Sequence, residues 1–159
     1  MFDAGQVLDA LQAVKDPEIP ALSIVELGLV ARLEVDGDAV RVALTPTFAG
    51  CPAVAVMRAE AERQLRALGA AEVVVEITFD PPWDSDRISD EGRRKLKAFG
   101  LAPPWRHNGA ADLLQLLVAD CPYCGSGDTR LESAFGPTLC RAIYYCDTCR
   151  QSFEQFKPV

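Results

Sequence analysis

Two Cys-x-x-Cys pairs near the end of the chain constrain its fold more than any other feature of the sequence. The pairs are Cys121-Pro122-Tyr123-Cys124 and Cys146-Asp147-Thr148-Cys149, and residues 125–145 separate them. This spacing is typical of a four-cysteine zinc site, in which each pair supplies two thiolates through a tight turn. Four thiolates also suit an iron–sulfur cluster, but zinc is favoured. We therefore expect one metal ion bound by Cys121, Cys124, Cys146 and Cys149.

The residues around these pairs have room for a small antiparallel sheet. Strands are predicted at Thr129 to Phe135, after which Gly136-Pro137 forms a turn, at Leu139 to Tyr145 and at Gln151 to Phe156. About 40 residues rarely build a sufficient core, so a bound metal would replace core as the source of stability. The tail is therefore predicted to be a zinc ribbon. Cys140 is its surplus thiol: a core residue, which is favoured, an alternative ligand or a reactive neighbour.

The distribution of the six cysteines divides the chain into two parts. Cys51 is the single cysteine before Cys121, so a cysteine-poor body precedes the cysteine-rich tail. Between them, Gly100 to Gly109 is rich in Pro and Gly and lacks an apolar period, which predicts a linker. We expect a first domain over residues 1–100, a linker and first strand over 101–118, and the ribbon over 119–159.

Composition and charge narrow the classes of function. The chain has 159 residues, 49% of them hydrophobic, yet no apolar run long enough to span a membrane and no basic and apolar leader, so a cytoplasmic protein is expected. In that compartment, six cysteines indicate metal or redox chemistry rather than disulfides. A net charge of −7 argues against nucleic-acid binding, which relies on Lys and Arg to neutralise phosphates.

The body has the pattern of a small α/β or α+β domain. A capping box at Asp3 and Gln6 starts the first helix, and Asp36-Gly37 predicts a hairpin turn. Helices packed on a small mixed sheet are therefore expected. The remaining predicted elements are strands at Ser23 to Leu27, Val30 to Val35, Val40 to Leu44 and Glu72 to Phe79, and helices at Pro52 to Leu68 and Ser89 to Phe99.

Cys51 falls where a loop becomes the predicted second helix. A helix N-terminus with a favourable charge partner can lower a thiol pKa from about 8.5 to between roughly 3.5 and 7.5, which gives a nucleophile or soft-metal ligand near neutral pH. The alternative is a buried cysteine that acts as a small hydrophobe. Asp16 and Glu18 offer two carboxylates in a Pro-containing turn, either as hard ligands or as turn residues. His107, the only histidine, is expected at the surface.

Motifs along nearly the whole chain resemble known families. In the body, the matching motifs are Asp16-Pro17-Glu18-Ile19-Pro20, Val25 to Val30, Leu44-Thr45-Pro46-Thr47 and Gly50-Cys51-Pro52. They resemble the SufT-like family of iron–sulfur assembly proteins. The further motifs are Pro81-Pro82-Trp83, Glu91 to Leu96, Phe135 to Cys146 and Phe153 to Lys157. Together with the ribbon, these resemble the PaaD family of bacterial phenylacetate degradation.

The resemblance implies an accessory role in a metal-dependent oxygenase system rather than an enzyme. Its partners would be subunits of the multicomponent phenylacetyl-CoA epoxidase, with its di-iron subunit and iron–sulfur flavin reductase, or general iron–sulfur assembly proteins. Cys51 would handle transient iron or an iron–sulfur cluster, with Asp16 and Glu18 as its neighbours. No membrane and no nucleic acid are implied.

Two alternatives to a maturation role stay open. One is a stoichiometric, non-catalytic subunit of the oxygenase. The other, disfavoured by the acidic charge, is a zinc-ribbon protein that binds nucleic acid. A homodimer would bring two Cys51 thiols together, which suits a bridging cluster, although no sequence pattern requires it.

Overall fold

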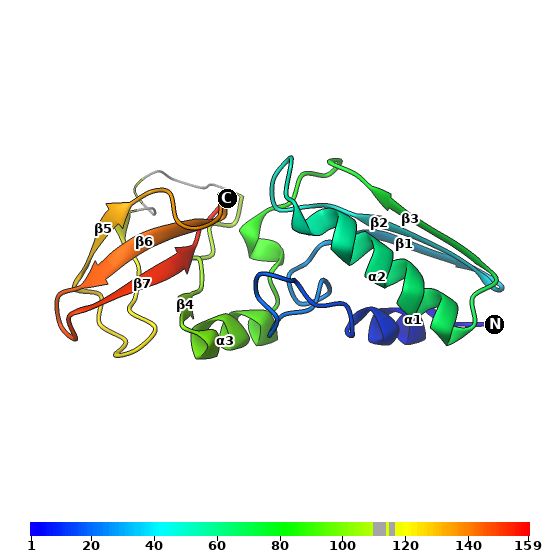
Figure 1. Ribbon diagram of the computed structural model, residues 1–159, viewed down its shortest axis with the longest axis horizontal. Coiled ribbons are helices and arrows are strands. Elements are labelled where there is room, and N and C mark those ends of the chain that lie inside the picture. Colours follow the sequence, from blue (N-terminus) through cyan, green and yellow to red (C-terminus); the bar gives the residue numbers. More distant parts are fainter. Residues whose placement is uncertain (110–113, 115–116) are drawn as a thin grey trace. The chain divides into compact units, whose positions relative to one another are not determined.

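A computed structural model describes residues 1–109, 114 and 117–159 (Figure 1). The chain divides into two compact units, Met1–Trp83 and Asp84–Val159. The sequence predicts a boundary between two independently folding domains near residue 100. That boundary stays a prediction, because the two units are defined by their contacts and not by independent folding. Within the described ranges, none of the helices has the length and apolar character needed to cross a bilayer.

The first unit is a three-stranded mixed sheet with two helices. Its strand order is β1-β2-β3, with β1 and β2 antiparallel and β2 and β3 parallel. Helix α2 connects the two parallel strands and packs against β3, and α1 packs against α2 (Figure 1). This arrangement confirms the predicted α/β class. The elements are α1 (Ala4–Leu11), β1 (Val30–Asp36), β2 (Ala39–Leu44), α2 (Ala53–Leu68) and β3 (Glu72–Ile77).

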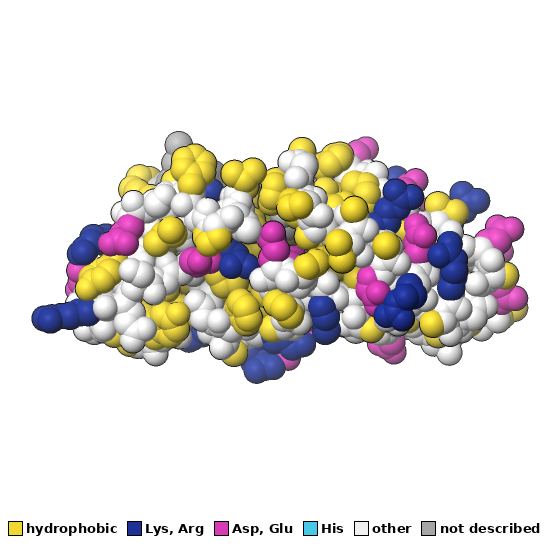
Figure 2. Space-filling model, viewed as in Figure 1, with side chains coloured by type: hydrophobic (Ala, Val, Ile, Leu, Met, Phe, Trp, Pro, Cys, Tyr) yellow, Lys and Arg dark blue, Asp and Glu magenta, His cyan; other side chains and the backbone are white. Residues whose placement is uncertain are grey.

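Local sequence signals set the ends of these helices. The Asp3 carboxylate accepts a hydrogen bond from the Gln6 N–H at 2.8 Å, and the Gln6 side chain accepts one from the Asp3 N–H at 3.0 Å, which is the predicted capping box. Pro52 precedes the first residue of α2, and Gly69 ends it with a left-handed φ of 106°. Charged side chains gather over the C-terminal half of α2 and hydrophobic ones over its N-terminal end (Figure 2).

The strand predicted at Ser23 to Leu27 is wrong. These residues form turns, and only one isolated bridge links Ser23 to Lys15. The Ser23 N–H donates to the Glu26 carboxylate at 2.9 Å, and the Glu26 N–H donates to the Ser23 hydroxyl at 3.0 Å. The apolar side chains that suggested a strand, Ile24 and Leu27, are fully buried within this turn. The side chains of Glu26 and Ser23 accept hydrogen bonds from these backbone N–H groups, which in a strand would bond to a neighbouring strand.

The second unit contains helix α3 and a four-stranded sheet with the order β4-β7-β6-β5. Strand β4, which falls within the predicted linker, runs parallel to β7, and the other pairs are antiparallel. A cluster of buried residues lies around the cysteine pairs and includes Cys121 and Cys146, with Tyr144 and Phe153 stacked at 5.6 Å between ring centroids. Its elements are α3 (Asp90–Phe99), β4 (Leu101–Ala102), β5 (Thr129–Ser133), β6 (Arg141–Cys146) and β7 (Gln151–Phe156).

Two positions on α2 test whether its buried face stabilises the first unit. Leu65 is fully buried, whereas Val56 on the same helix is 58% exposed. Leu65→Ala is expected to lower the free energy of unfolding by about 2–5 kcal/mol, because it removes buried methyl groups and leaves a cavity. Val56→Ala should change it by less than about 0.5 kcal/mol. Urea unfolding followed by circular dichroism measures both values, and equal values for the two variants would contradict this packing.

Candidate metal centre and thiol site

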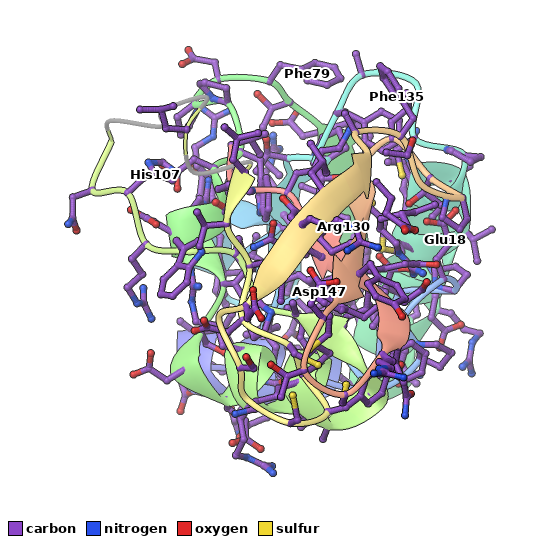
Figure 3. All side chains as sticks on the ribbon, turned by 90° about the vertical axis from the view of Figure 1, so that its left-hand side faces the viewer. Glu18, Phe79, His107, Arg130, Phe135 and Asp147 are labelled. Carbon is purple, nitrogen blue, oxygen red and sulfur yellow. The ribbon has the colours of Figure 1, made fainter. Side chains whose placement is uncertain are left out.

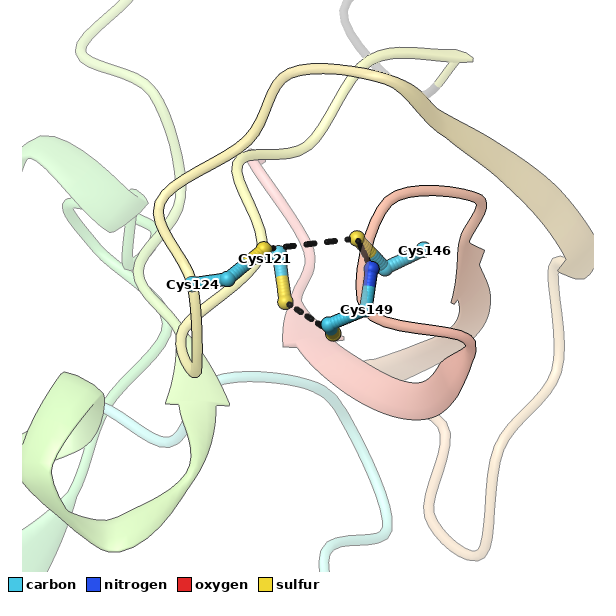
Figure 4. Close-up of side chains that lie close together, drawn as sticks. All are labelled: Cys121, Cys124, Cys146 and Cys149. Carbon is cyan, nitrogen blue, oxygen red and sulfur yellow. Dashed lines mark hydrogen bonds between the residues drawn. The ribbon is translucent and has the colours of Figure 1, made fainter.

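The structure brings together the four cysteines of the two predicted pairs. The sulfur atoms of Cys121, Cys124, Cys146 and Cys149 all lie within 4.8 Å of one another (Figure 4). The Sγ atoms of Cys121 and Cys149 are 3.7 Å apart, and those of Cys124 and Cys146 are 3.6 Å apart. A tetrahedron with zinc–sulfur distances of about 2.3 Å has edges of about 3.8 Å. The donor set therefore fits a four-coordinate thiophilic ion.

Each cysteine pair lies in a turn of the same form. The Gly125 N–H donates to the Cys121 carbonyl at 2.9 Å, and the Arg150 N–H donates to the Cys146 carbonyl at 2.8 Å. Gly125 and Arg150 both have a positive φ, of 77° and 59°. Glycine adopts this conformation without a steric cost, whereas arginine does not. The glycine therefore makes the first turn predictable from the sequence. The second turn has an arginine at the same position, so contacts with neighbouring residues have to stabilise it.

Contacts outside the sulfur cluster hold the two turns in place. The hydroxyls of Ser126 and Thr148, one from each turn, are 2.7 Å apart. Arg130 on β5 forms an ion pair with Asp147 in the second turn, and its guanidinium lies 4.4 Å from the centroid of the Tyr145 ring (Figure 3). These links place both cysteine pairs on one rigid framework, which favours simultaneous binding of one ion by four ligands.

The environments of the thiols differ within the cluster. The Cys149 N–H donates to the Cys146 sulfur at 3.5 Å and lowers the pKa of Cys146 to about 7. Burial raises the pKa of Cys149 to about 12. Since a metal ion binds thiolates, its binding has to displace protons from this cluster.

The surplus cysteine of the tail, Cys140, lies outside the sulfur cluster. It precedes β6 instead of lying within a strand, is half-buried, and is not part of the core cluster that contains Cys121 and Cys146. Its sulfur is 3.0 Å from the Thr138 hydroxyl. The strand predicted from Leu139 therefore begins later, at Arg141, because the β5–β6 connection extends further than the sequence pattern suggested. The core role of Cys140 stays a prediction.

Asp84, Asp86 and His107 form a second group of metal-ligating residue types. His107 is 8% exposed rather than at the surface, its Nδ1 accepts from the Gly109 N–H at 3.1 Å, and its Nε2 lies 2.8 Å from the Val159 carbonyl. Burial opposes ionisation of Asp86, but N–H groups of His107 and Asn108 donate to its carboxylate and lower its pKa. Both ring nitrogens of His107 thus have hydrogen-bond partners in the protein. The contacts of this group link His107 to Asp86 and to Val159.

Cys51 lies immediately before α2, as the sequence predicts. It is half-buried, and its carbonyl accepts a hydrogen bond from the Val54 N–H at 3.3 Å. Pro52, at the N-cap, supplies no capping side chain to the first turn of the helix. The positive end of the helix dipole is therefore directed toward the segment that carries the thiol.

A cavity of about 560 Å³ opens beside Cys51, between α2 and the end of β3. Arg58 and Glu62 line it along α2, and the Arg58 Nε lies 3.5 Å from a Glu62 carboxylate oxygen. This cavity was not predicted from the sequence. The sequence does contain one sign of it, because Val54, Arg58 and Glu62 are spaced four residues apart and therefore lie on one face of the helix. The apolar walls come from Pro46, Val54, Ala55, Ala59, Ile77 and Phe79.

The two predicted supporting carboxylates belong to an ordered turn. The Asp16 carboxylate accepts hydrogen bonds from the N–H groups of Glu18 at 2.7 Å and Ile19 at 3.2 Å. The turn-forming role of Asp16 is thus visible, and Glu18 is half-buried (Figure 3). Support of Cys51 by either carboxylate stays a prediction.

The fold and the cysteine cluster define a two-part protein, a small mixed α/β domain followed by a four-cysteine ribbon. Residues 5–79 match the family described as iron-sulfur cluster assembly protein, and residues 108–157 match the PaaD zinc beta ribbon domain. The chain is 37% identical over 147 residues to an Escherichia coli (strain K12) protein provisionally assigned as a subunit of 1,2-phenylacetyl-CoA epoxidase. That alignment covers 92% of this chain and 88% of the relative. The chain therefore belongs to the PaaD family.

Two further relatives match the body of the chain. An Fe-S protein maturation auxiliary factor of Porphyromonas gingivalis is 32% identical over 92 residues, which cover 57% of this chain and 87% of that protein. A conserved hypothetical protein from Thermotoga maritima, whose structure is solved, is 38% identical with a TM-score of 0.52. That match covers 60% of this chain and 94% of the other. The family resemblance found in the sequence is confirmed.

Metal analysis of single-cysteine variants tests the ion bound by the ribbon. The purified chain is expected to contain about one zinc ion, and Cys121→Ser should lose most of it because the ligand set is incomplete. Cys140→Ser is the matched control and should retain its zinc, since Cys140 lies outside the cluster. An iron–sulfur absorbance that disappears in Cys121→Ser would contradict the zinc assignment, as would a wild-type chain without zinc.

Proposed function

We propose that this chain is an accessory maturation factor for the metal centres of a multicomponent phenylacetyl-CoA epoxidase. The observation that carries the proposal is Cys51, a half-buried thiol at the start of α2 that lines a cavity and takes no part in the four-cysteine cluster. The iron-sulfur assembly match over residues 5–79 and the relative assigned to the epoxidase support the class of client. The client would be the oxygenase, and its iron or cluster would be the cargo.

Cys51 would hold the iron or cluster through a single soft ligand, its thiolate sulfur, and release it to the client. The helix dipole favours its thiolate, which binds iron readily. One protein thiolate holds a metal less firmly than a complete set of four, so the cargo can pass to a client site that offers more ligands. Asp16 and Glu18, in the turn after α1, are proposed as supporting carboxylates for this step.

The ribbon would hold zinc as a structural metal. Cys121, Cys124, Cys146 and Cys149 would fill all four positions around the ion, so no open position remains for a substrate or water. When bound, the ion would supply cross-linking of the two turns and no Lewis-acid chemistry. A core cluster of this unit has two of the four cysteines among its buried residues, which supports a metal as a source of its stability.

A second candidate function is that of a stoichiometric, non-catalytic epoxidase subunit. The name of the Escherichia coli relative, which describes it as an epoxidase subunit, favours this role. Co-purification of this chain with the active epoxidase in equal amounts would support it. Full turnover by the remaining purified subunits alone would exclude it and leave the maturation role.

The maturation role is tested by expressing the epoxidase subunits together with Cys51→Ser. We expect an assembled oxygenase whose iron content falls well below that obtained with the wild-type chain, because the thiol that carries the cargo is missing. Cys140→Ser is the matched control, since it removes a half-buried cysteine that is not in the cluster. Iron and zinc analysis of the purified oxygenase and of the chain provides the readout. Normal iron content of the oxygenase with Cys51→Ser would refute the proposal.

A further inference from the structure

We infer that the cavity beside Cys51 is a docking site for an acidic segment of the client protein that inserts an apolar anchor side chain. The inference rests on the proposed function, because it names the feature by which the client would be recognised at the same site. It adds a binding step that is separate from the chemistry of the thiol. Binding and transfer can therefore fail independently of each other.

The size and walls of the cavity suit an apolar side chain. Its volume of about 560 Å³ lies within the range of roughly 300–1,000 Å³ that is usual for ligand pockets. Small side chains, Ala55 and Ala59, form the wall on α2 and leave room for an anchor. Phe79 forms part of the opposite wall and is 55% exposed at the outer edge of the molecule (Figure 3). Exposed apolar surface around a hollow is typical of binding sites.

The charge at the rim favours carboxylates in the bound segment. Glu62, in the cavity lining, lies between two guanidinium groups: Arg58, also in the lining, at 3.5 Å, and Arg66, two helical turns further along α2 and outside the lining, at 3.4 Å. One carboxylate thus faces two cations, which leaves a local positive excess on a chain whose net charge is −7. The N-terminus of α2 adds positive potential at the other end of the cavity, beside Cys51. Opposite charge in the partner would raise its association rate and orient the anchor.

Cys51 belongs to the lining of the same cavity. A segment seated there would therefore lie against the thiol, and transfer of iron or a cluster would occur within one complex. Holding two reacting groups together in this way replaces an encounter in solution by a step within the complex. A thiol that only bound a free ion would need neither apolar neighbours nor a positive charge nearby. Docking of a client segment explains why the cavity beside Cys51 has both.

The experiment measures binding of purified, metal-free epoxidase subunits to the full, zinc-loaded chain at several salt concentrations. Ala59→Trp fills the cavity from an exposed helix position, and Arg58→Glu reverses the charge at the rim. Val56→Trp is the control for bulk, since Val56 is 58% exposed and does not line the cavity. Arg63→Glu is the control for charge, because Arg63 also pairs with a glutamate on α2 but lies outside the lining.

We expect Ala59→Trp to weaken binding by about tenfold or more, the size of effect found at central interface positions. Arg58→Glu should slow association and reduce its salt dependence. Both controls should stay within about twofold of the wild-type chain, and the far-UV circular dichroism spectrum should be unchanged in all four variants, which checks their folding. Cys51→Ser should still bind.

Two results would overturn the inference, and they differ in what else they refute. If the wild-type chain binds but Ala59→Trp and Arg58→Glu bind equally well, the client docks elsewhere and the maturation role stands. If the wild-type chain binds no epoxidase subunit, or associates only with a second copy of itself, both the docking site and the proposed client are wrong.

Discussion

The geometry of four thiolates around one ion is the constraint on which the second unit depends. Two residues of the buried cluster around its cysteine pairs, Cys121 and Cys146, are expected metal ligands. The two turns that carry the cysteines precede β5 and follow β6, and direct contacts such as the Ser126–Thr148 hydroxyl pair join them. A bound ion would supply the stronger cross-link that such a short sheet needs, which is why small metal-binding domains fold with their metal.

The four clustered cysteines differ in their setting from Cys51, the thiol that we propose to act in transfer. The four clustered thiols form a closed ligand set, and a closed set leaves no position for chemistry. Cys51 has a different setting, at the start of a helix and in the wall of an open cavity. We therefore propose that stability and function depend on different thiols, and that the helix N-terminus rather than a metal makes Cys51 reactive.

Features with a local physical cause could be predicted from the sequence. Pro52 and Gly69 fix the ends of α2, and the spacing of the cysteine pairs predicts their meeting. Features that depend on distant partners could not. His107 is buried because the Val159 carbonyl lies against it, and the cavity exists because Phe79 lies opposite Arg58 and its neighbours. Ser23 forms a turn instead of the predicted strand, because the Glu26 carboxylate accepts the hydrogen bond that a neighbouring strand would otherwise accept.

We propose that Cys51 carries iron while the ribbon carries a structural metal. Iron and zinc analysis with Mössbauer spectroscopy of the anaerobically purified chain, with and without Cys51→Ser, tests it most directly. We expect a small amount of bound iron that disappears in Cys51→Ser, with the zinc content unchanged. Iron retained by Cys51→Ser would show that Cys51 does not carry the cargo, because the iron would then be bound elsewhere in the chain.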